Sequence, residues 1–219
     1  MFKFRDRIEA GYSLAKVLIH YKNLDALILA IPRGGVPIGK IVADELGLPL
    51  EVILSKKIGL PTQKEYAIGA VSLVGSVVNP NINVSEYYIK SETKRIQDLL
   101  QQRYKNYYKD RVPLSLKDKI VIIVDDGIAT GFTLLSTIQM IRQQSPYKVV
   151  VAVPVASPRG VEWLKEQIAI DEVIVLLAPD NFQSVGQFYE TFEQVTDQEV
   201  DKILSSSHKP PKERPNPEI

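Results

Sequence analysis

Five predominantly apolar runs, separated by helical patterns and polar segments, constrain the fold of this chain most strongly. The runs cover residues 26–31, 50–55, 119–124, 148–156 and 172–178. Apolar runs of this length are typical of strands that are covered on both faces. Because such strands alternate here with helical patterns, the sequence predicts an α/β fold in which a central, mostly parallel sheet has helices on both faces.

The predicted helices cover residues 36–46, 133–144 and 158–168, and Asp6 is placed to cap an earlier one. The apolar side of that first helix is expected to carry Ile8, Tyr12, Ala15 and Ile19. Ligands of parallel sheets bind beyond the carboxyl ends of the strands. The sequences PRGG, KKIG, DDGIATGFT and ASPRG are all expected at that edge, so the chain predicts one crevice there.

The stretch VIIVDDGIATGFTLLSTI, residues 121–138, is the most informative of these segments. A short run rich in Gly and Thr leads from Asp125 and Asp126 into a helix. Glycine lets backbone N–H groups approach an anion closely, and a helix N-terminus adds unpaired N–H groups, so this run predicts a phosphate cradle. Two carboxylates would repel a phosphate, and they must face sugar hydroxyls, a metal ion or a developing cation. Together these features predict a site for a phosphorylated sugar.

Three other interpretations of this stretch remain open. Receiver domains of two-component systems also carry paired acids after a strand, but there the acids follow the first strand and a phospho-acceptor Asp follows a later one. A Walker P-loop needs Gly-Lys-Ser/Thr at its end, which is missing. A plain turn with a helix cap would need neither the double Asp nor the two Gly and Thr elements.

Composition excludes several classes of function. The chain has no cysteine, which removes disulfides, thiolate metal sites and a Cys nucleophile. Its two histidines, His20 and His208, lie far apart, so a histidine triad or multi-histidine metal site is not expected. A net charge of +1 argues against bulk electrostatic binding to nucleic acid. No signal peptide or membrane-spanning run is visible, and a cytoplasmic location is expected.

The segment VIIVDDGIATGFT closely resembles the signature for phosphoribosyl pyrophosphate (PRPP) of type I phosphoribosyltransferases. FRDRIEAG, LAIPRGGVPIGKIVADELGLPL, KKIG, EYAIGAV, AVPVASP and VGQFYETFEQVTDQEV are similar to one bacterial branch without an assigned substrate, some members of which are fused to a hydrolase domain. The resemblance covers nearly all of residues 3–204. It implies a phosphoribosyltransferase domain over residues 1–204 and leaves residues 205–219 as a polar tail that is expected to be disordered.

The resemblance implies a role for each residue of the motifs. Asp125 and Asp126 would bind the ribose hydroxyls, partly through Mg²⁺, and Arg33, with Gly34 and Gly35, would form a pyrophosphate loop that often contains a non-proline cis peptide, here Pro32–Arg33. The 5-phosphate cradle would comprise Gly127, Ala129, Thr130, Gly131, Phe132 and Thr133.

The same resemblance implies that Lys56 and Lys57 reach the pyrophosphate, although a solvated surface pair is the alternative. Residues 63–69 would form a mobile cover loop that excludes water. The implied reaction transfers phosphoribose from PRPP to a nitrogenous base or related nucleophile and releases pyrophosphate, with Mg²⁺. A PRPP-binding regulatory protein without efficient turnover is the other candidate.

The acceptor is less well defined. Ala129 stands where 6-oxopurine enzymes usually have Asp, and Val155 stands where they have Lys, so an adenine-like base fits better. Residues 179–195 resemble a hood in which Phe182 would stack on the base and Glu190 would lie near the metal, although core packing is an equal alternative for Phe182.

Residues 85–111 form a predicted inserted helix with seven Lys or Arg, four Asp or Glu and five Tyr. Its apolar stripe comprises Ile89, Ile96, Leu100, Tyr104 and Tyr107. This stripe predicts a face that packs on the domain or on a second subunit, which is preferred to an RNA-binding arm. The expected partners are therefore PRPP and a small-molecule acceptor, with a homodimer expected and nucleic acid not expected.

Overall fold

A five-stranded parallel sheet forms the centre of the computed structural model. The model describes residues 2–64, 66–73, 75–79, 81–108, 112–129 and 132–207, apart from the side chains of residues 132, 133 and 136. The strands lie in the order β2 (Leu50–Val52), β1 (Ala26–Ala30), β6 (Ile120–Val124), β7 (Lys148–Val155) and β8 (Glu172–Leu177). All neighbouring strands pair in parallel, which confirms the predicted fold class.

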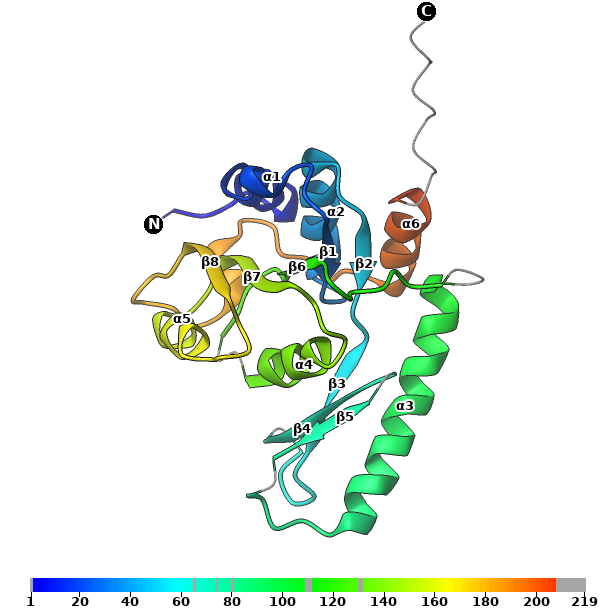
Figure 1. Cartoon of the computed structure of the whole chain (residues 1–219). Helices are drawn as coiled ribbons and strands as arrows, with labels where there is room; N and C mark the ends of the chain where they lie inside the picture. Colours follow the sequence, from blue (N-terminus) through cyan, green and yellow to red (C-terminus); the bar gives the residue numbers. More distant parts are fainter. Residues whose placement is uncertain are drawn as a thin grey trace, which may run out of the picture.

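Helices cover both faces of this sheet. In Figure 1, one pair lies above it, α1 (Arg7–Val17) and α2 (Gly35–Leu46), and another pair lies below it, α4 (Phe132–Arg142) and α5 (Pro158–Lys165). Alternate strand residues therefore join two separate apolar clusters: Ile28, Ile122 and Val150 on one side, and Leu27, Val121 and Val149 on the other. This double burial explains why the runs lack polar alternation.

The buried side of α1 differs from the expected one. Asp6 caps the helix as predicted and accepts hydrogen bonds from the N–H groups of Ile8 and Glu9. Ile8 and Tyr12, however, are 52% and 46% exposed, and the buried residues are Ala10, Gly11, Leu14 and Ala15. A Cβ on Gly11 would lie 2.9 Å from Cβ of Ile41 in α2, so small residues let the two helices approach closely. The predicted apolar side is therefore right for Ala15 and wrong for Ile8, Tyr12 and Ile19, which is 54% exposed.

The chain leaves the parallel sheet earlier than expected after β2. The predicted strand over residues 50–55 stops at Val52, and three antiparallel strands form a second sheet: β3 (Ser55–Gly59), β4 (Ala67–Ser72) and β5 (Ser76–Val78). This sheet and α3 (Glu86–Tyr108) are together called the arm. The arm extends below α4 in Figure 1, and Ser55 Oγ lies 2.8 Å from Thr137 Oγ1 of α4.

The stripe of α3 packs within the chain. Ile96, Leu100 and Tyr107 are at most 1% exposed, and α3 contacts β3, β4 and a C-terminal helix, α6 (Asp197–Ser207). The Tyr108 hydroxyl donates to the Glu51 carboxylate over 2.6 Å. The packing interpretation of this helix is therefore confirmed, and its stripe is not available to stack on RNA bases.

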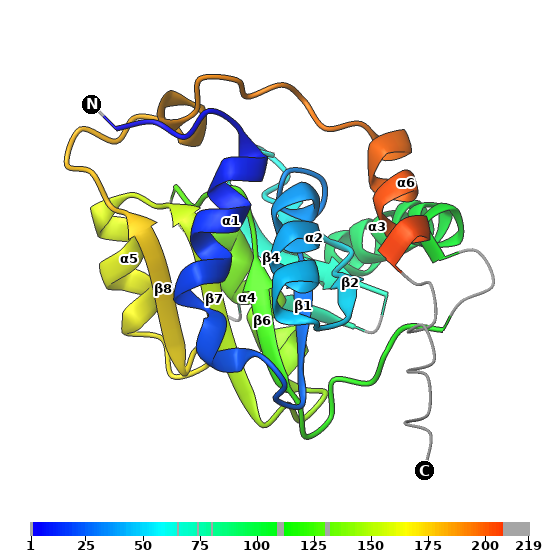
Figure 2. The same cartoon turned by 90° about the horizontal axis from the view of Figure 1, so that it is seen from above.

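The C-terminal part of the domain runs over the carboxyl edge of the sheet. Figure 2 shows residues 179–195, with the short helix η2 (Val185–Phe188), passing from β8 along the start of α1 to α6. Residues 205–207 belong to α6, so the predicted tail begins too early, and residues 208–219 lie outside the described part of the chain. Within the described ranges, no helix is both long and apolar enough to cross a membrane.

Candidate functional site

The strand order places the site between β1 and β6. From β1 the chain moves to β2 on one side of it, and later strands continue from β6 on the other side. The order therefore reverses at this point, where open α/β sheets bind their ligands. The strand ends that precede the two loops pair directly, because the Ile31 N–H donates to the carbonyl oxygen of Val124 over 2.9 Å, and Gly34 lies next to the Asp126 carboxylate. The predicted convergence of PRGG and DDGIATGFT is thus confirmed.

Gly34 and Gly35 allow this contact. A Cβ on Gly34 would lie 1.9 Å from Oδ2 of Asp126, and a Cβ on Gly35 would lie 2.6 Å from the Val124 carbonyl oxygen. Any larger residue would therefore displace the acid pair or the loop. The peptide bond Pro32–Arg33 is cis, as the resemblance implies.

The acid pair is partly buried at this edge. The backbone N–H of Asp126 donates to Oδ1 of Asp125 over 2.8 Å. This hydrogen bond fixes the orientation of the Asp125 carboxylate. Burial raises the pKa of the Asp125 carboxyl well above its ordinary value, and the Asp126 carboxylate raises it further. The pair is therefore electrostatically unfavourable without a cation or hydroxyl groups beside it.

Arg7 supplies such a cation, and sequence reasoning missed it. Its Nε and Nη2 donate to Oδ2 of Asp126 over 3.0 and 2.8 Å. Its Nη1 donates to the carbonyl oxygen of Glu193 over 2.8 Å, and its guanidinium lies 3.9 Å from the ring centroid of Phe192. Burial raises the pKa of Asp126, whereas the Arg7 hydrogen bonds lower it. The only signal in the sequence is FRDR, which by its local pattern predicts no more than a helix start.

Residues 179–195, the predicted hood, pack against the loop after β6 that carries the acid pair. The Tyr189 hydroxyl donates to the carbonyl oxygen of Asp126 over 2.7 Å. A Cβ on Gly127 would lie 2.5 Å from Cγ1 of Val185, so this glycine is required by the packing of the hood on the loop. The N-terminal segment joins the same layer, because the Glu190 N–H donates to the carbonyl oxygen of Phe4 over 2.8 Å.

Arg33 is held by the C-terminal helix. Its Nη1 lies 3.6 Å from Oδ2 of Asp197, the first residue of α6. The Tyr107 hydroxyl of α3 donates to the other carboxylate oxygen of Asp197. The loop after β1 is therefore linked through the Asp197 carboxylate to the arm.

Lys56 and Lys57 do not follow directly from a strand of the parallel sheet. They lie within β3, opposite Val71 and Ala70 of β4. The expectation that KKIG lies at the edge of the main sheet is therefore wrong, because β3 belongs to the arm. The predicted cover loop over residues 63–69 is also partly wrong, since β4 begins at Ala67.

The remaining cradle residues are only partly described. Ala129 is exposed, and its carbonyl oxygen accepts a hydrogen bond from Ser157, which caps α5. Phe132 and Thr133 form the start of α4. Thr130 and Gly131 lie outside the described residues.

Phe182 and Glu190 are the two weaker candidates for base binding. Phe182 is partly buried and stacks on Phe188 with ring centroids 5.7 Å apart. This stacking favours the core-packing interpretation. The Glu190 side chain is exposed. Both assignments stay predictions.

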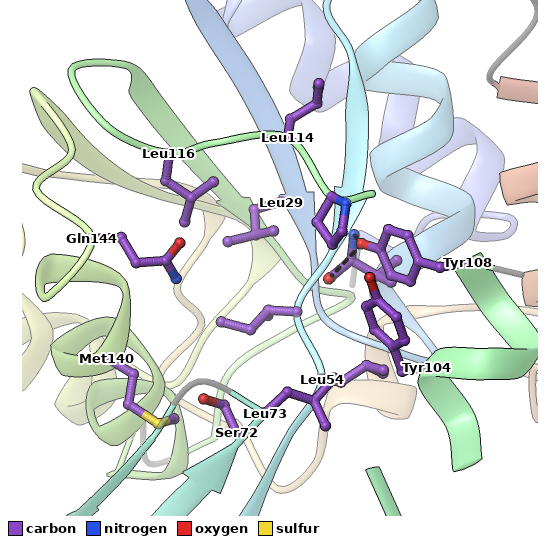
Figure 3. A pocket seen from close by; sticks show the side chains of 13 residues that line it. Leu29, Leu54, Ser72, Leu73, Tyr104, Tyr108, Leu114, Leu116, Met140 and Gln144 are labelled. Carbon is purple, nitrogen blue, oxygen red and sulfur yellow. Dashed lines mark hydrogen bonds between the residues drawn. The ribbon is translucent and has the colours of Figure 1, made fainter. Parts of the chain in front are cut away.

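An apolar hollow of about 140 Å³ lies elsewhere, between β2, α3 and α4. Figure 3 shows Leu54, Leu73 and Met140 around it together with Tyr104 and Tyr108, whose rings stack 4.7 Å apart. None of the described residues that line it is a lysine, an arginine or an acid. The lining of this hollow therefore does not suit a phosphate.

The fold and the site together define an α/β protein whose polar site lies where the strand order reverses, between β1 and β6.

Comparisons with known proteins agree with this geometry. A family model described as a phosphoribosyl transferase domain matches residues 7–190. Proteins of Mycobacterium tuberculosis strains CDC 1551 and H37Rv, named as phosphoribosyl transferases, are 36% identical over 214 residues, covering 94% of this chain and 47% of theirs. The crystal structure of TT1426 from Thermus thermophilus is 38% identical with a TM-score of 0.84, covering 94% of this chain and 99% of that one.

The chain belongs to the phosphoribosyltransferase family. It spans about half the length of the Mycobacterium relatives. A uracil phosphoribosyltransferase of Thermococcus sibiricus is also similar, with 25% identity over 189 residues and 79% of each chain covered.

Proposed function

We propose that the protein transfers phosphoribose from PRPP to a nitrogenous base or related nucleophile and releases pyrophosphate. The observation that carries this proposal is the direct contact between the glycine loop after β1 and the acid pair after β6. A glycine loop that would bind a diphosphate, next to two carboxylates, suits a sugar that carries phosphates and free hydroxyls. Membership of the family supports the same reaction.

Each group would act on a different part of the donor. The N–H groups at the start of α4 would bind the 5-phosphate, because a helix N-terminus attracts anions. The carboxylates of Asp125 and Asp126 would accept hydrogen bonds from the ribose hydroxyls and favour the positive charge that develops on the ribose. Arg33 would neutralise the leaving pyrophosphate.

Mg²⁺ fits this set of donors. Carboxylate oxygens are the ligands that Mg²⁺ prefers, and it commonly takes one or two of them together with phosphate oxygens and water. In the described part of the chain, no group of three or more acidic or histidine residues is placed to hold a metal ion. Asp125 and Asp126 would therefore share the ion with the donor, and the ion would supply charge neutralisation of the diphosphate.

The acceptor is proposed to be a base without a 6-oxo group. Val155 is fully buried in β7 and offers no cation, and Ala129 offers no carboxylate for a purine nitrogen. Adenine-like bases are thus the first candidates. Uracil is the second, because a similar protein from Thermococcus sibiricus is named as a uracil phosphoribosyltransferase.

A PRPP-binding regulatory protein is the second candidate function. One observation favours it: Asp126 is already paired with Arg7, and Arg33 is already paired with Asp197. A donor would have to compete with these internal partners, and an Arg33 that stays paired with Asp197 would neutralise the leaving pyrophosphate less, which would slow turnover.

Pyrophosphate release from PRPP and Mg²⁺ distinguishes the two functions. The assay uses a panel of adenine-like bases, uracil and small amines, with binding followed by calorimetry. We expect Arg33→Ala to lower the rate by about tenfold or more, and to lower PRPP affinity less, because the leaving group gains charge toward the transition state. Lys16→Ala, at the exposed far end of α1, is the control.

Two results would change this conclusion. PRPP that binds but releases no pyrophosphate with any acceptor would favour the regulatory protein. Absence of any PRPP binding would remove both functions.

A further inference from the structure

The two edges of the parallel sheet are protected to different degrees. The edge strand β2 has three residues, and the Tyr108 hydroxyl of α3 covers its end by accepting a hydrogen bond from the Val52 N–H over 3.2 Å. The opposite edge strand, β8, has six residues, and Figure 2 shows it at the margin of the sheet next to β7. Among the described residues, no strand pairs with the outer side of β8. The β2 edge is therefore short and covered, whereas the β8 edge is long and open.

The outer side of β8 presents backbone hydrogen-bonding groups. The Leu177 carbonyl oxygen accepts from the Ala156 N–H, which follows β7, over 3.0 Å, and the register between the two strands is constant. Because the backbone groups of successive residues in a strand point to opposite sides, those of Ile174 and Leu176 point away from β7. No other described residue forms a hydrogen bond with them. The open edge thus offers two N–H and two carbonyl groups to a further strand.

The side chains at this edge are apolar on both faces of the sheet. Four half-buried residues extend the two apolar clusters to the edge: Ile174 and Leu176 on one face, and Val173 and Val175 on the other. The only charged residue of the strand, Glu172, is paired with Lys148 of β7 over 2.6 Å. The edge therefore has no lysine, proline or unpaired charge of the kind that prevents one strand from pairing with another.

We propose that β8 pairs with β8 of a second copy of this chain, antiparallel and about a two-fold axis. Two-fold symmetry is the commonest in homo-oligomers, and it brings the same patch of each copy together. With the axis at Val175, Ile174 of one copy exchanges backbone hydrogen bonds with Leu176 of the other, and the two Val175 side chains are direct neighbours. Apolar side chains then meet apolar side chains on both faces, and the two five-stranded sheets become continuous.

The charges of α5 favour a second copy over a strand from another protein. This helix packs against β8, and it carries two exposed cations and two exposed carboxylates: Arg159, Lys165, Glu162 and Glu166. None of the four forms an ion pair with another described residue. About a two-fold axis the α5 helices of the two copies run antiparallel, so that Arg159 at the start of one helix faces the end of the other, where Glu166 lies. An extended peptide would not supply these opposite charges.

Cross-linking through a single cysteine tests the register of the pair. The chain has no cysteine, so Val175→Cys introduces its only thiol. Opposite residues at a non-hydrogen-bonded position of antiparallel strands have Cα atoms about 4.5 Å apart, which is within the range of a disulfide. We expect the oxidant diamide to link Val175→Cys into a covalent dimer about tenfold or more faster than the matched control Val77→Cys, because the paired strands hold the two thiols together. Val77 is a half-buried valine in β5, an edge strand of the arm.

A charge exchange tests the same contact without a covalent bond. Val175→Lys and Val175→Glu each place two like charges side by side on the axis, and each alone should raise the dissociation constant of the dimer about tenfold or more. An equal mixture of the two variants should form a heterodimer, because opposite charges then face each other. Sedimentation equilibrium of the full chain measures all three constants, and Val77→Lys is the control. Thermal melting shows whether each variant folds, and the conservative Val175→Cys still tests the pairing if the charged variants do not.

Three results would overturn the pairing of β8 with its copy. The first is a wild-type chain that stays monomeric at every concentration measured, which would leave the edge to a strand from another protein. The second is a dimer in which Val175→Cys cross-links no faster than Val77→Cys. The third is a dimer whose dissociation constant is unchanged in both charged variants, which would place the interface on another surface. None of these results bears on the proposed reaction, because PRPP binding is not part of the measurement.

Discussion

Replacing Arg7 tests how the buried acid pair is held. In Arg7→Met the apolar stem is kept, but the Asp126 carboxylate loses both hydrogen bonds from the guanidinium. The side chains of Arg7 and Asp126 are 12% and 16% exposed. Removing one partner of a fully buried pair costs about 3–5 kcal/mol, and because some exposure remains here we expect about 2–3 kcal/mol. For a chain of this size this corresponds to a fall in melting temperature of about 4–12 °C.

The size of this loss should depend on pH in a defined direction. The pair stabilises the protein only while Asp126 is ionised, and without Arg7 the folded-state pKa of Asp126 rises further above its unfolded value. The unpaired carboxylate then takes up a proton as the pH falls through that raised pKa. The difference in the free energy of unfolding between wild type and Arg7→Met should therefore shrink toward acidic pH.

Differential scanning calorimetry across pH, with a double-mutant cycle, measures both effects. Arg7→Met combined with Asp126→Asn should cost less than the sum of the single changes by about 1–2 kcal/mol, because the unpaired charge is gone. Arg5→Met is the control, since the Arg5 side chain is 75% exposed and its ion pair with Glu9 is worth at most about 1 kcal/mol. An Arg7 effect no larger than that of Arg5, or strictly additive changes, would refute this account of the site.

Two other substitutions test the site and the arm. Asp125→Asn should raise the free energy of unfolding of the ligand-free protein at neutral pH by about 0.5–2 kcal/mol, which thermal melting measures. The same variant should bind PRPP more weakly in calorimetry. Because the folded-state pKa of Asp125 is raised, the ionised Asp125 carboxylate destabilises the folded protein fully above that pKa. The gain from Asp125→Asn should therefore vanish as the pH falls and the carboxylate of the wild type takes up a proton. Leu100→Ala should cost about 2–5 kcal/mol in urea unfolding, because Leu100 is 1% exposed between α3 and its neighbours, whereas the exposed Gln101→Ala should change little. A Leu100 effect as small as that of Gln101 would contradict the packing of the arm.

The sequence by itself determined the parallel sheet and the location of the site. Continuous apolar runs can only be buried on both faces, and the segments that follow parallel strands must meet at one edge. For that reason the sequence predicts one crevice that holds Asp125, Asp126, Gly34 and Gly35, whereas the pairing of β1 with β6, which brings them into contact, is decided by the fold. The Asp6 cap follows from local hydrogen bonding.

Only the tertiary structure decided the partners of these groups. Arg7 and Asp126 are 119 residues apart, and nothing local to FRDR indicates a carboxylate. The departure of β3 into the arm and the pairing of Arg33 with Asp197 depend likewise on long-range packing. Local pattern indicates the buried strands and how the backbone turns, whereas the buried side of α1 and the charge pairing depend on which elements the whole fold brings together.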